Sequence, residues 1–276
     1  MTTVFETLVE LVKLMAVFAI VAYLVSRTDW FFDVCNRRIT PKSALLTTAM
    51  FSAMSILGNY SGVEILGAIA NVRDPGPMIA GLLGGPLIGF TAGLIGGTYR
   101  YFMGGFSAVP SALSTVISGT LGGLVWLTKK KLIGPVWAAA FAFSMETLHM
   151  LLTLVMAQPF SQAVSVVEAL YLPMALTNSI SMAIFTFIVG NVTKERNMAI
   201  EKERLQQELT QKEIRIRELE IGRLRKYSSD LEATVAKLEI VIDEEHVRKE
   251  AEKIMGTDFF KDLLNQLVAV KRARSA

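Results

Sequence analysis

One stretch of the chain, residues 71–105, constrains the fold more than any other segment. It reads NVRDPGPMIAGLLGGPLIGFTAGLIGGTYRYFMGG and is apolar and glycine-rich, with an arginine near each end. About 20 apolar residues cross the hydrocarbon core of a bilayer, so this segment is too long for one span. Gly84-Gly85-Pro86 stops a helix, because proline lacks a backbone N–H and crowds the preceding turn. The sequence therefore predicts two helical arms that fold back on each other.

The two arginines of this stretch, Arg73 and Arg100, form the first candidate site. They lie at similar distances along the chain from the turn, so a hairpin places both guanidinium groups at similar depth. An arginine at membrane depth costs roughly 3 kcal/mol and is kept mainly where it has a partner. Two cations facing one small volume would bind an anion. Two plainer alternatives stay open: each arginine extends to the lipid headgroups, or Arg73 pairs with its neighbour Asp74.

Composition places the chain among membrane proteins, since 52% of its 276 residues are hydrophobic. We predict an all-α, polytopic membrane protein with six to seven membrane segments, including the hairpin, followed by a cytoplasmic coiled coil. Two histidines, one cysteine and the lack of any Walker loop or nucleophile motif give no metal, cofactor or catalytic residue to propose. The apolar runs are Leu8–Val25, Ala44–Leu57, Pro77–Leu83, Leu87–Tyr99, Ala108–Leu127, Gly134–Ala157 and Leu170–Val192.

Charge divides the chain into unlike parts. Residues 1–192 contain 18 charged side chains and residues 193–276 contain 35, so the net charge of +3 is no sign of nucleic-acid binding. We interpret 1–192 as a transmembrane sensor domain, 193–255 as a cytoplasmic signalling coiled coil and 256–276 as the start of an output domain that is missing or truncated.

The distribution of basic residues predicts the orientation, because short cytoplasmic loops are enriched in Lys and Arg. Basic residues cluster between the first two apolar runs and at Lys129–Lys131, whereas Gln158–Glu168 has none. If both hairpin arms cross the membrane, every basic cluster lies on one side. We therefore predict a cell-membrane protein with its N-terminus outside, its C-terminus in the cytoplasm and both arginines near the outer face.

The charged part has apolar residues at steps of three and four, with a slip near Gly222, and no proline. This pattern predicts a parallel homodimeric coiled coil that continues the last span; the alternative is a monomeric helix with surface ion pairs. Gly256-Thr257-Asp258 is a helix stop followed by capping residues. His246 would be a phosphoacceptor only in the presence of a kinase domain, and a histidine on a solvated helix is usually plain surface.

Further candidate site residues lie in later apolar runs. Ser111 and Ser114 share one face of a helix that begins after Pro110, where hydroxyls and unpaired backbone N–H groups would donate hydrogen bonds to an anionic oxygen; alternatively Ser111 only caps that helix. Glu146 and His149 are three residues apart, and Asn178 lies in the last run. These three polar residues line the same pocket, pair with Arg73 or Arg100, or join helices by hydrogen bonds.

Four passages resemble the sensor region of LytS-type receptors, the five-transmembrane family of bacterial and archaeal signalling proteins. They are the 71–105 stretch, Asn36-Arg37-Arg38, SMETLHML around Glu146, and LPMALTNSISMAIF from Leu172 to Phe185. An N-x-R, the GGP turn and an R-x-x-M-G-G end occur in that order, and the resemblance covers about residues 5–195.

The resemblance implies a membrane receptor of a two-component system that binds a small extracellular ligand, with carboxylates such as pyruvate a known type, and relays to a histidine kinase. Carried over, it makes Arg73 and Arg100 ligand-binding candidates, with Ser111, Ser114 and Asn71 beside them. LytS-type kinases continue into GAF, phosphoacceptor and ATPase parts that these residues do not contain, so the output belongs to a longer chain or another one. A transporter or substrate-capture subunit is the alternative function, because Gly-rich segments with a GP turn also resemble vitamin-uptake components.

Overall fold

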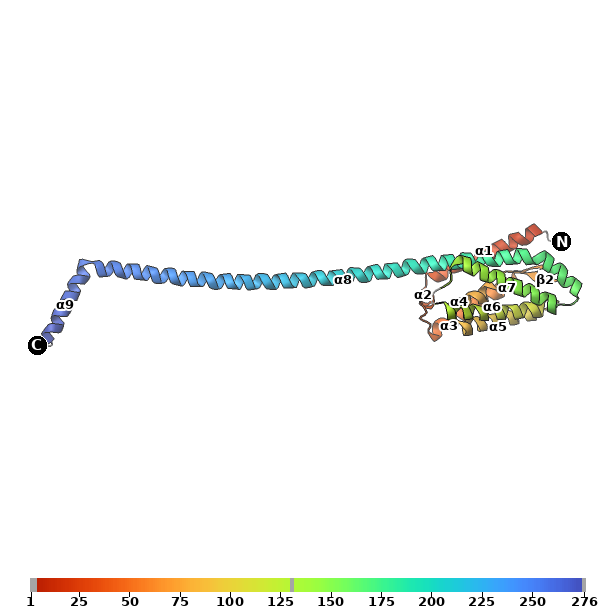
Figure 1. The fold of residues 1–276 in the computed structure, drawn as a ribbon, viewed down its shortest axis with the longest axis horizontal. Helices are drawn as coiled ribbons and strands as arrows, with labels where there is room; N and C mark the ends of the chain where they lie inside the picture. The colour runs from red at the N-terminus through yellow and green to blue at the C-terminus, as the bar shows by residue number, and fades with distance from the viewer. Residues whose placement is uncertain (1–3, 130–131, 275–276) are drawn as a thin grey trace. The chain divides into compact units, whose positions relative to one another are not determined.

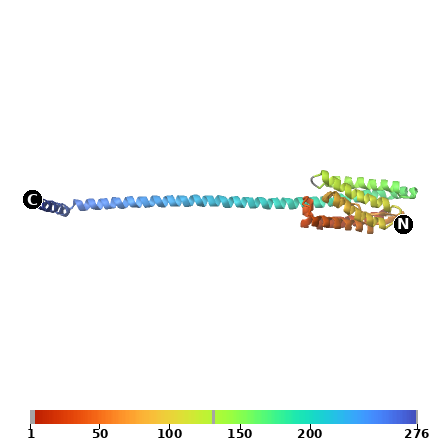
Figure 2. The same cartoon turned by 90° about the horizontal axis from the view of Figure 1, so that it is seen from below.

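The computed structural model describes residues 4–129 and 132–274. The chain divides into two units, Met1–Ile200 and Glu201–Ala276. In the first unit, helices lie side by side in both views (Figures 1 and 2). The elements are α1 (Val4–Ser26), α2 (Asp29–Cys35), α3 (Pro41–Tyr60), β1 (Val63–Ile65), β2 (Ala68–Ala70), α4 (Pro75–Gly84), α5 (Pro86–Phe102), α6 (Ala108–Thr128), α7 (Pro135–Met156), α8 (Phe160–Gly256) and α9 (Asp258–Arg274).

Each predicted apolar run coincides with a helix, as a helical membrane protein requires; only Gly134–Ala157 extends past its helix, α7, by one residue at each end. By length and composition, α6, α7 and the apolar part of α8 can each cross a bilayer, and Met15–Ser26 with α2 is a further candidate if this pair, bent by 97°, counts as one span. α4 has 10 residues and is therefore about 15 Å long, too short to cross alone. The protein is a polytopic helical membrane protein, and the exact number of spans stays a prediction.

The predicted fold-back at Gly84-Gly85-Pro86 is present. Gly85 has φ +91°, a conformation that residues with a Cβ rarely adopt, and Pro86 then occupies the first turn of α5. A Cβ placed on Gly89 of α5 would lie 2.7 Å from the Cα of Gly81 in α4, which is possible only if the two arms run back along each other. The arms also meet α6, because the same Cβ would lie 2.1 Å from the carbonyl oxygen of Gly119.

This close backbone packing predicts a large effect of one added methyl group. We expect Gly89→Ala to lower the free energy of unfolding by about 1–3 kcal/mol, because two backbones must move apart. Gly190→Ala is the matched control, since its Cβ would meet nothing within 4 Å. Thermal denaturation of both variants in detergent checks this, and equal midpoints for the two would contradict it.

Basic residues gather at one end of the first unit. The guanidinium group of Arg37 stacks 4.2 Å from the centre of the Trp126 ring and donates hydrogen bonds to the carbonyl oxygens of Trp126 and Lys129. Arg196 of α8 donates to Asp29 Oδ1 at 2.6 Å. The connection from α1 to α3, which includes α2, therefore shares this end with the end of α6 and with Arg196 of α8, as the topology requires. Lys130 and Lys131 lie outside the described residues. Which end faces the cytoplasm stays a prediction.

The β-hairpin is an addition to the all-α prediction. β1 and β2 pair antiparallel, with Val63 opposite Ala70, and the turn places Leu66 and Gly67 at φ 52° and 78°. Gln162, near the start of α8, donates to the carbonyl oxygen of Leu66 at 2.9 Å. The hairpin therefore contacts the first turn of α8, away from the basic end (Figure 1).

The second unit contains the rest of α8 and α9. α8 is one continuous helix of 97 residues, and Gly256 ends it at the predicted stop, with α9 beginning at Asp258. Apolar side chains along this unit are exposed: Leu205, Leu209, Ile216, Leu219, Leu224, Leu231, Val235 and Leu238. The coiled coil, the homodimer and the domain boundaries at 192 and 255 stay predictions.

Candidate functional site

Arg73 lies in the segment between β2 and α4 and is fully buried, with 0% of its surface exposed. Its Nε is 2.8 Å from Asp74 Oδ1, and its Nη1 donates to Asn59 Oδ1 at 3.3 Å. Asn71 donates to the same oxygen at 3.4 Å. Arg73 therefore pairs with Asp74, which was one of the two plainer alternatives, and the headgroup alternative is wrong for it.

Arg100, in the last turn of α5, is equally buried at 1% exposure but is differently partnered. It donates from Nη1 to the Gly104 carbonyl oxygen at 2.7 Å and from Nη2 to Ser107 Oγ at 3.1 Å. Its Nε has no hydrogen-bond partner, and no carboxylate of residues 4–129 or 132–274 forms an ion pair with it. Arg100 is thus a buried cation without a counter-ion among the described residues.

Ser111 and Ser114 are buried on α6 as expected, but they do not lie at its first residues. The helix begins at Ala108, so the Ser111 N–H already bonds to the Ser107 carbonyl oxygen at 3.1 Å. The expectations that Ser111 caps the helix and that its backbone N–H is available to an anion are both wrong. These serines make contacts through their hydroxyl groups. Ser111 Oγ lies 3.0 Å from His149 Nε2, and Ser114 Oγ donates to the Ser111 carbonyl oxygen.

Glu146, His149 and Asn178 meet in one buried hydrogen-bonded group. The Nδ1 atom of His149 lies 2.9 Å from Glu146 Oε1, and Asn178 Nδ2 donates to Glu146 Oε2 at 2.7 Å. Glu146 therefore joins α7 to α8, as the interhelical hydrogen-bond alternative expected. None of the three contacts either arginine through a hydrogen bond.

Thr115 connects this group to the Arg73–Asp74 pair. Its hydroxyl lies 2.7 Å from Asp74 Oδ1 and 2.9 Å from the Ser111 carbonyl oxygen. Buried polar groups thus run from the start of α4, through α6 and α7, to Asn178 in α8. Sequence reasoning did not select Thr115 or Asn59, because threonine and asparagine in an apolar run carry no spacing signal.

A small cavity of about 10 Å³ lies between this polar network and the β-hairpin. Ser107, Ser111 and His149 line it on the polar side, and Ala68 and Ile69 of the hairpin line it opposite. Such a volume holds about one water molecule. A carboxylate ligand here requires the surrounding groups to move apart.

Asp74, Glu146 and His149 also offer ligand atoms that all lie within 4.8 Å of one another. Each of these atoms already serves another contact: Asp74 pairs with Arg73, and Glu146 and His149 bond to each other. A metal ion would have to replace those contacts. The group is better explained as a network that neutralises and orders buried polar side chains.

The Arg73–Asp74 pair predicts a strong stability effect. We expect Asp74→Asn to lower the free energy of unfolding by about 3–5 kcal/mol, because it leaves Arg73 as a buried, uncompensated charge. Glu208→Gln is the control, since it breaks an exposed pair with Arg204 that is worth only about 0.3–0.5 kcal/mol. Thermal denaturation measures both, and a mild effect of Asp74→Asn would mean that Arg73 finds another partner.

Comparison with known proteins places these residues in one family region. The family model described as 5TMR of 5TMR-LYT matches residues 29–192, a stretch that includes all eight candidate site residues. "Sensor histidine kinase BtsS" of Escherichia coli (strain K12) is 36% identical over 191 residues, which cover 67% of this chain and 34% of the relative.

Two further relatives show the same pattern. "Sensor protein LytS" of Bacillus subtilis (strain 168) is 31% identical over 211 residues, which cover 70% of this chain and 36% of the relative. "Sensor histidine kinase YpdA" of Escherichia coli (strain K12) is 28% identical over 201 residues, with 71% and 35% covered. The chain thus spans about a third of the length of the curated relatives it matches. No solved structure gives a significant match.

Proposed function

We propose that this chain senses a small extracellular anion, most simply a carboxylate such as pyruvate. The premise is that the chain belongs to the LytS-type five-transmembrane receptor family, whose model matches residues 29–192. Two of the named relatives are sensor histidine kinases, and this chain is a multi-pass membrane protein that matches about a third of their length. The ligand, its site and the output are the proposed part.

The observation that carries the proposal is the difference between the two arginines. Arg73 has its counter-ion in Asp74, whereas Arg100 is buried with an unpartnered Nε and no acidic partner among the described residues. A buried cation is costly unless it is paired. An anion from solution supplies the missing charge, and a planar carboxylate fits the guanidinium fork with two parallel hydrogen bonds.

The groups around Arg100 suit a small ligand. Ser107 touches both Arg100 and the small cavity, which Ser111 and His149 also line. A carboxylate bound to Arg100 can accept further hydrogen bonds from these hydroxyls, with Ser114 one turn further along α6. Asn71 and Arg73 then hold the surrounding framework, while Glu146 and Asn178 lie beyond His149 from the ligand.

The same contacts suggest how binding reaches the output. A ligand that competes for the Ser111 hydroxyl weakens its contact with His149, which is hydrogen-bonded to Glu146 and through it to Asn178 of α8. α8 continues without a break to Gly256, so a change at Asn178 acts on the helix that leads to the output. We propose that this helix pairs with a second copy as a coiled coil, which buries its exposed apolar residues, and that the pair controls a cytoplasmic histidine kinase.

A ligand screen tests the proposed function. The purified protein is heated with each of a panel of small carboxylates, inorganic phosphate and chloride, and a true ligand at one hundred times its dissociation constant adds about 2.7 kcal/mol of stability. At least one carboxylate is expected to stabilise. No stabilisation by any anion would contradict anion sensing, and uptake of the stabilising anion into protein-containing vesicles would favour a transporter.

A further inference from the structure

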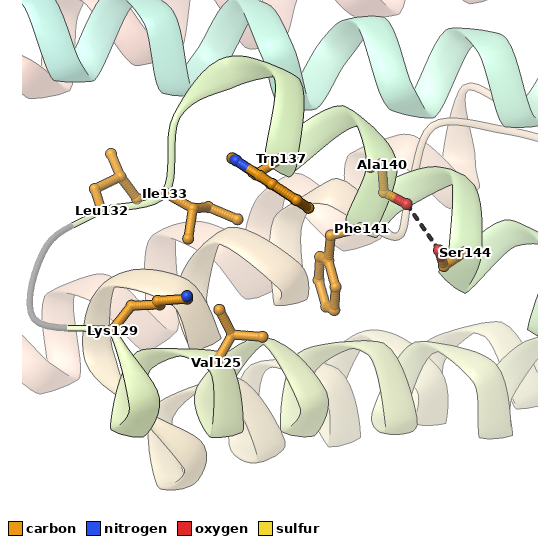
Figure 3. Close-up of a pocket in the computed structure, with 8 residues that line it drawn as sticks. All are labelled: Val125, Lys129, Leu132, Ile133, Trp137, Ala140, Phe141 and Ser144. Atoms are coloured by element: carbon orange, nitrogen blue, oxygen red, sulfur yellow. Dashed lines mark hydrogen bonds between the residues drawn. The ribbon is translucent and has the colours of Figure 1, made fainter.

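A second cavity lies at the basic end of the first unit, separate from the buried polar network. Its volume is about 720 Å³, within the range of cavities that hold whole ligands. It lies between the end of α6 and the start of α7 (Figure 3). The lining side chains are Val125, Lys129, Leu132, Ile133, Trp137, Ala140, Phe141 and Ser144.

The walls of this cavity are apolar. Trp137 and Phe141 turn their rings toward the space from α7, and Val125 faces them from α6 (Figure 3). The hydroxyl of Ser144 donates to the Ala140 carbonyl oxygen at 2.8 Å, so its hydrogen is already used in a hydrogen bond within α7. These apolar walls offer no hydrogen bonds to a polar solute, whereas a bound hydrocarbon chain buries their surface away from water.

One rim of the cavity is cationic. The ammonium group of Lys129 lies on the cavity side of its helix end (Figure 3). Arg37 fixes the backbone there, because it donates to the carbonyl oxygens of Lys129 and Trp126. Trp137 is exposed, and tryptophan is enriched at membrane–water interfaces.

We propose that this cavity binds a phospholipid with an anionic headgroup. Its acyl chain lies against Val125, Trp137 and Phe141, and its phosphate contacts the ammonium group of Lys129. Basic pockets between transmembrane helices are a known form of lipid recognition. The charge at the rim gives the selectivity: one lysine near the headgroups favours an anionic over a zwitterionic lipid by about fivefold in affinity.

Lipids with brominated acyl chains test this binding, because bromine quenches a nearby tryptophan. The chain has three tryptophans, so Trp30→Phe and Trp126→Phe leave Trp137 as the reporter inside the cavity. Bilayers contain equal amounts of phosphatidylglycerol and phosphatidylcholine, and only one of the two carries bromine. We expect clearly stronger quenching of Trp137 when the bromine is on phosphatidylglycerol, corresponding to an approximately fivefold preference.

Two lysine variants in the same background assign the preference. Lys129→Gln should make both brominated lipids quench equally, whereas Lys42→Gln, an exposed lysine that does not line the cavity, should keep the preference. Equal quenching by the two lipids in the parent would overturn the proposal, as would an unchanged preference in Lys129→Gln. Quenching by neither lipid would also overturn it, and would indicate that a protein segment covers the cavity.

Discussion

Replacing Arg100 with methionine is expected to raise the stability of the ligand-free protein and to abolish its response to the anion. The guanidinium group is buried without a carboxylate among the described residues, and its Nε has no partner. Removing such a charge in favour of an apolar side chain of similar length is expected to stabilise by roughly 1–4 kcal/mol, although two hydrogen bonds are lost. A gain in stability together with a loss of ligand binding is the signature of a functional charge.

Arg73→Met is the matched control, because the two arginines differ mainly in their partners. Losing Arg73 leaves Asp74 buried without its cation, so we expect destabilisation by about 3–5 kcal/mol. Thermal denaturation with and without the stabilising carboxylate measures both effects. If Arg100→Met is destabilised as strongly as Arg73→Met, or still responds to the anion, Arg100 is a structural residue.

Asn178→Asp is expected to disconnect the output from the ligand. It places a second carboxylate beside Glu146, so the hydrogen bond of 2.7 Å between α7 and α8 becomes a repulsion. Adding Glu146→Gln should restore the link with exchanged roles, since the amide donates to the new carboxylate while its oxygen still accepts from His149. We expect the single variant to bind the anion while its signalling response falls at least tenfold. The double variant should recover that response.

Disulfide crosslinking between copies reads out this response. In a Cys35→Ser background, a cysteine at Val235 of the proposed coiled coil reports the rate of crosslinking with and without the carboxylate. Thr147→Ala is the control, because it removes another side-chain hydrogen bond between α7 and α8, Thr147 to Tyr171 at 3.0 Å, without touching the buried network. An unchanged response in Asn178→Asp, or no recovery in the double variant, would contradict a route through Glu146.

Strong local signals made much of the fold predictable. The Gly84-Gly85-Pro86 turn and the stop at Gly256 depend on residues that interrupt a helix, and the apolar runs depend on the length of helix that a bilayer buries. Their positions therefore follow from the sequence. The β-hairpin was missed because its turn carries Leu66 at positive φ, whereas the usual signal for such a turn is Asn-Gly or Asp-Gly.

The sequence predicted which residues belong to the candidate site, but not which of their side chains contact one another. Buried charges in apolar runs identified Arg73, Arg100 and Glu146, yet the sequence could not decide that Asp74 neutralises only one arginine. Neither could it place Ser111 one turn inside its helix rather than at the cap. Thr115 connects the network through hydrogen bonds that depend on how α4, α6 and α7 pack, and packing of this kind has no local signal.

Equilibrium dialysis with a radiolabelled carboxylate tests the central claim most directly, namely that a small anion binds at Arg100. The protein is compared with Arg100→Met and with Lys129→Gln, which removes a cation at the other end of the unit. We predict saturable binding of one anion per chain that is lost in Arg100→Met and retained in Lys129→Gln. Saturable binding that survives in Arg100→Met would contradict the account.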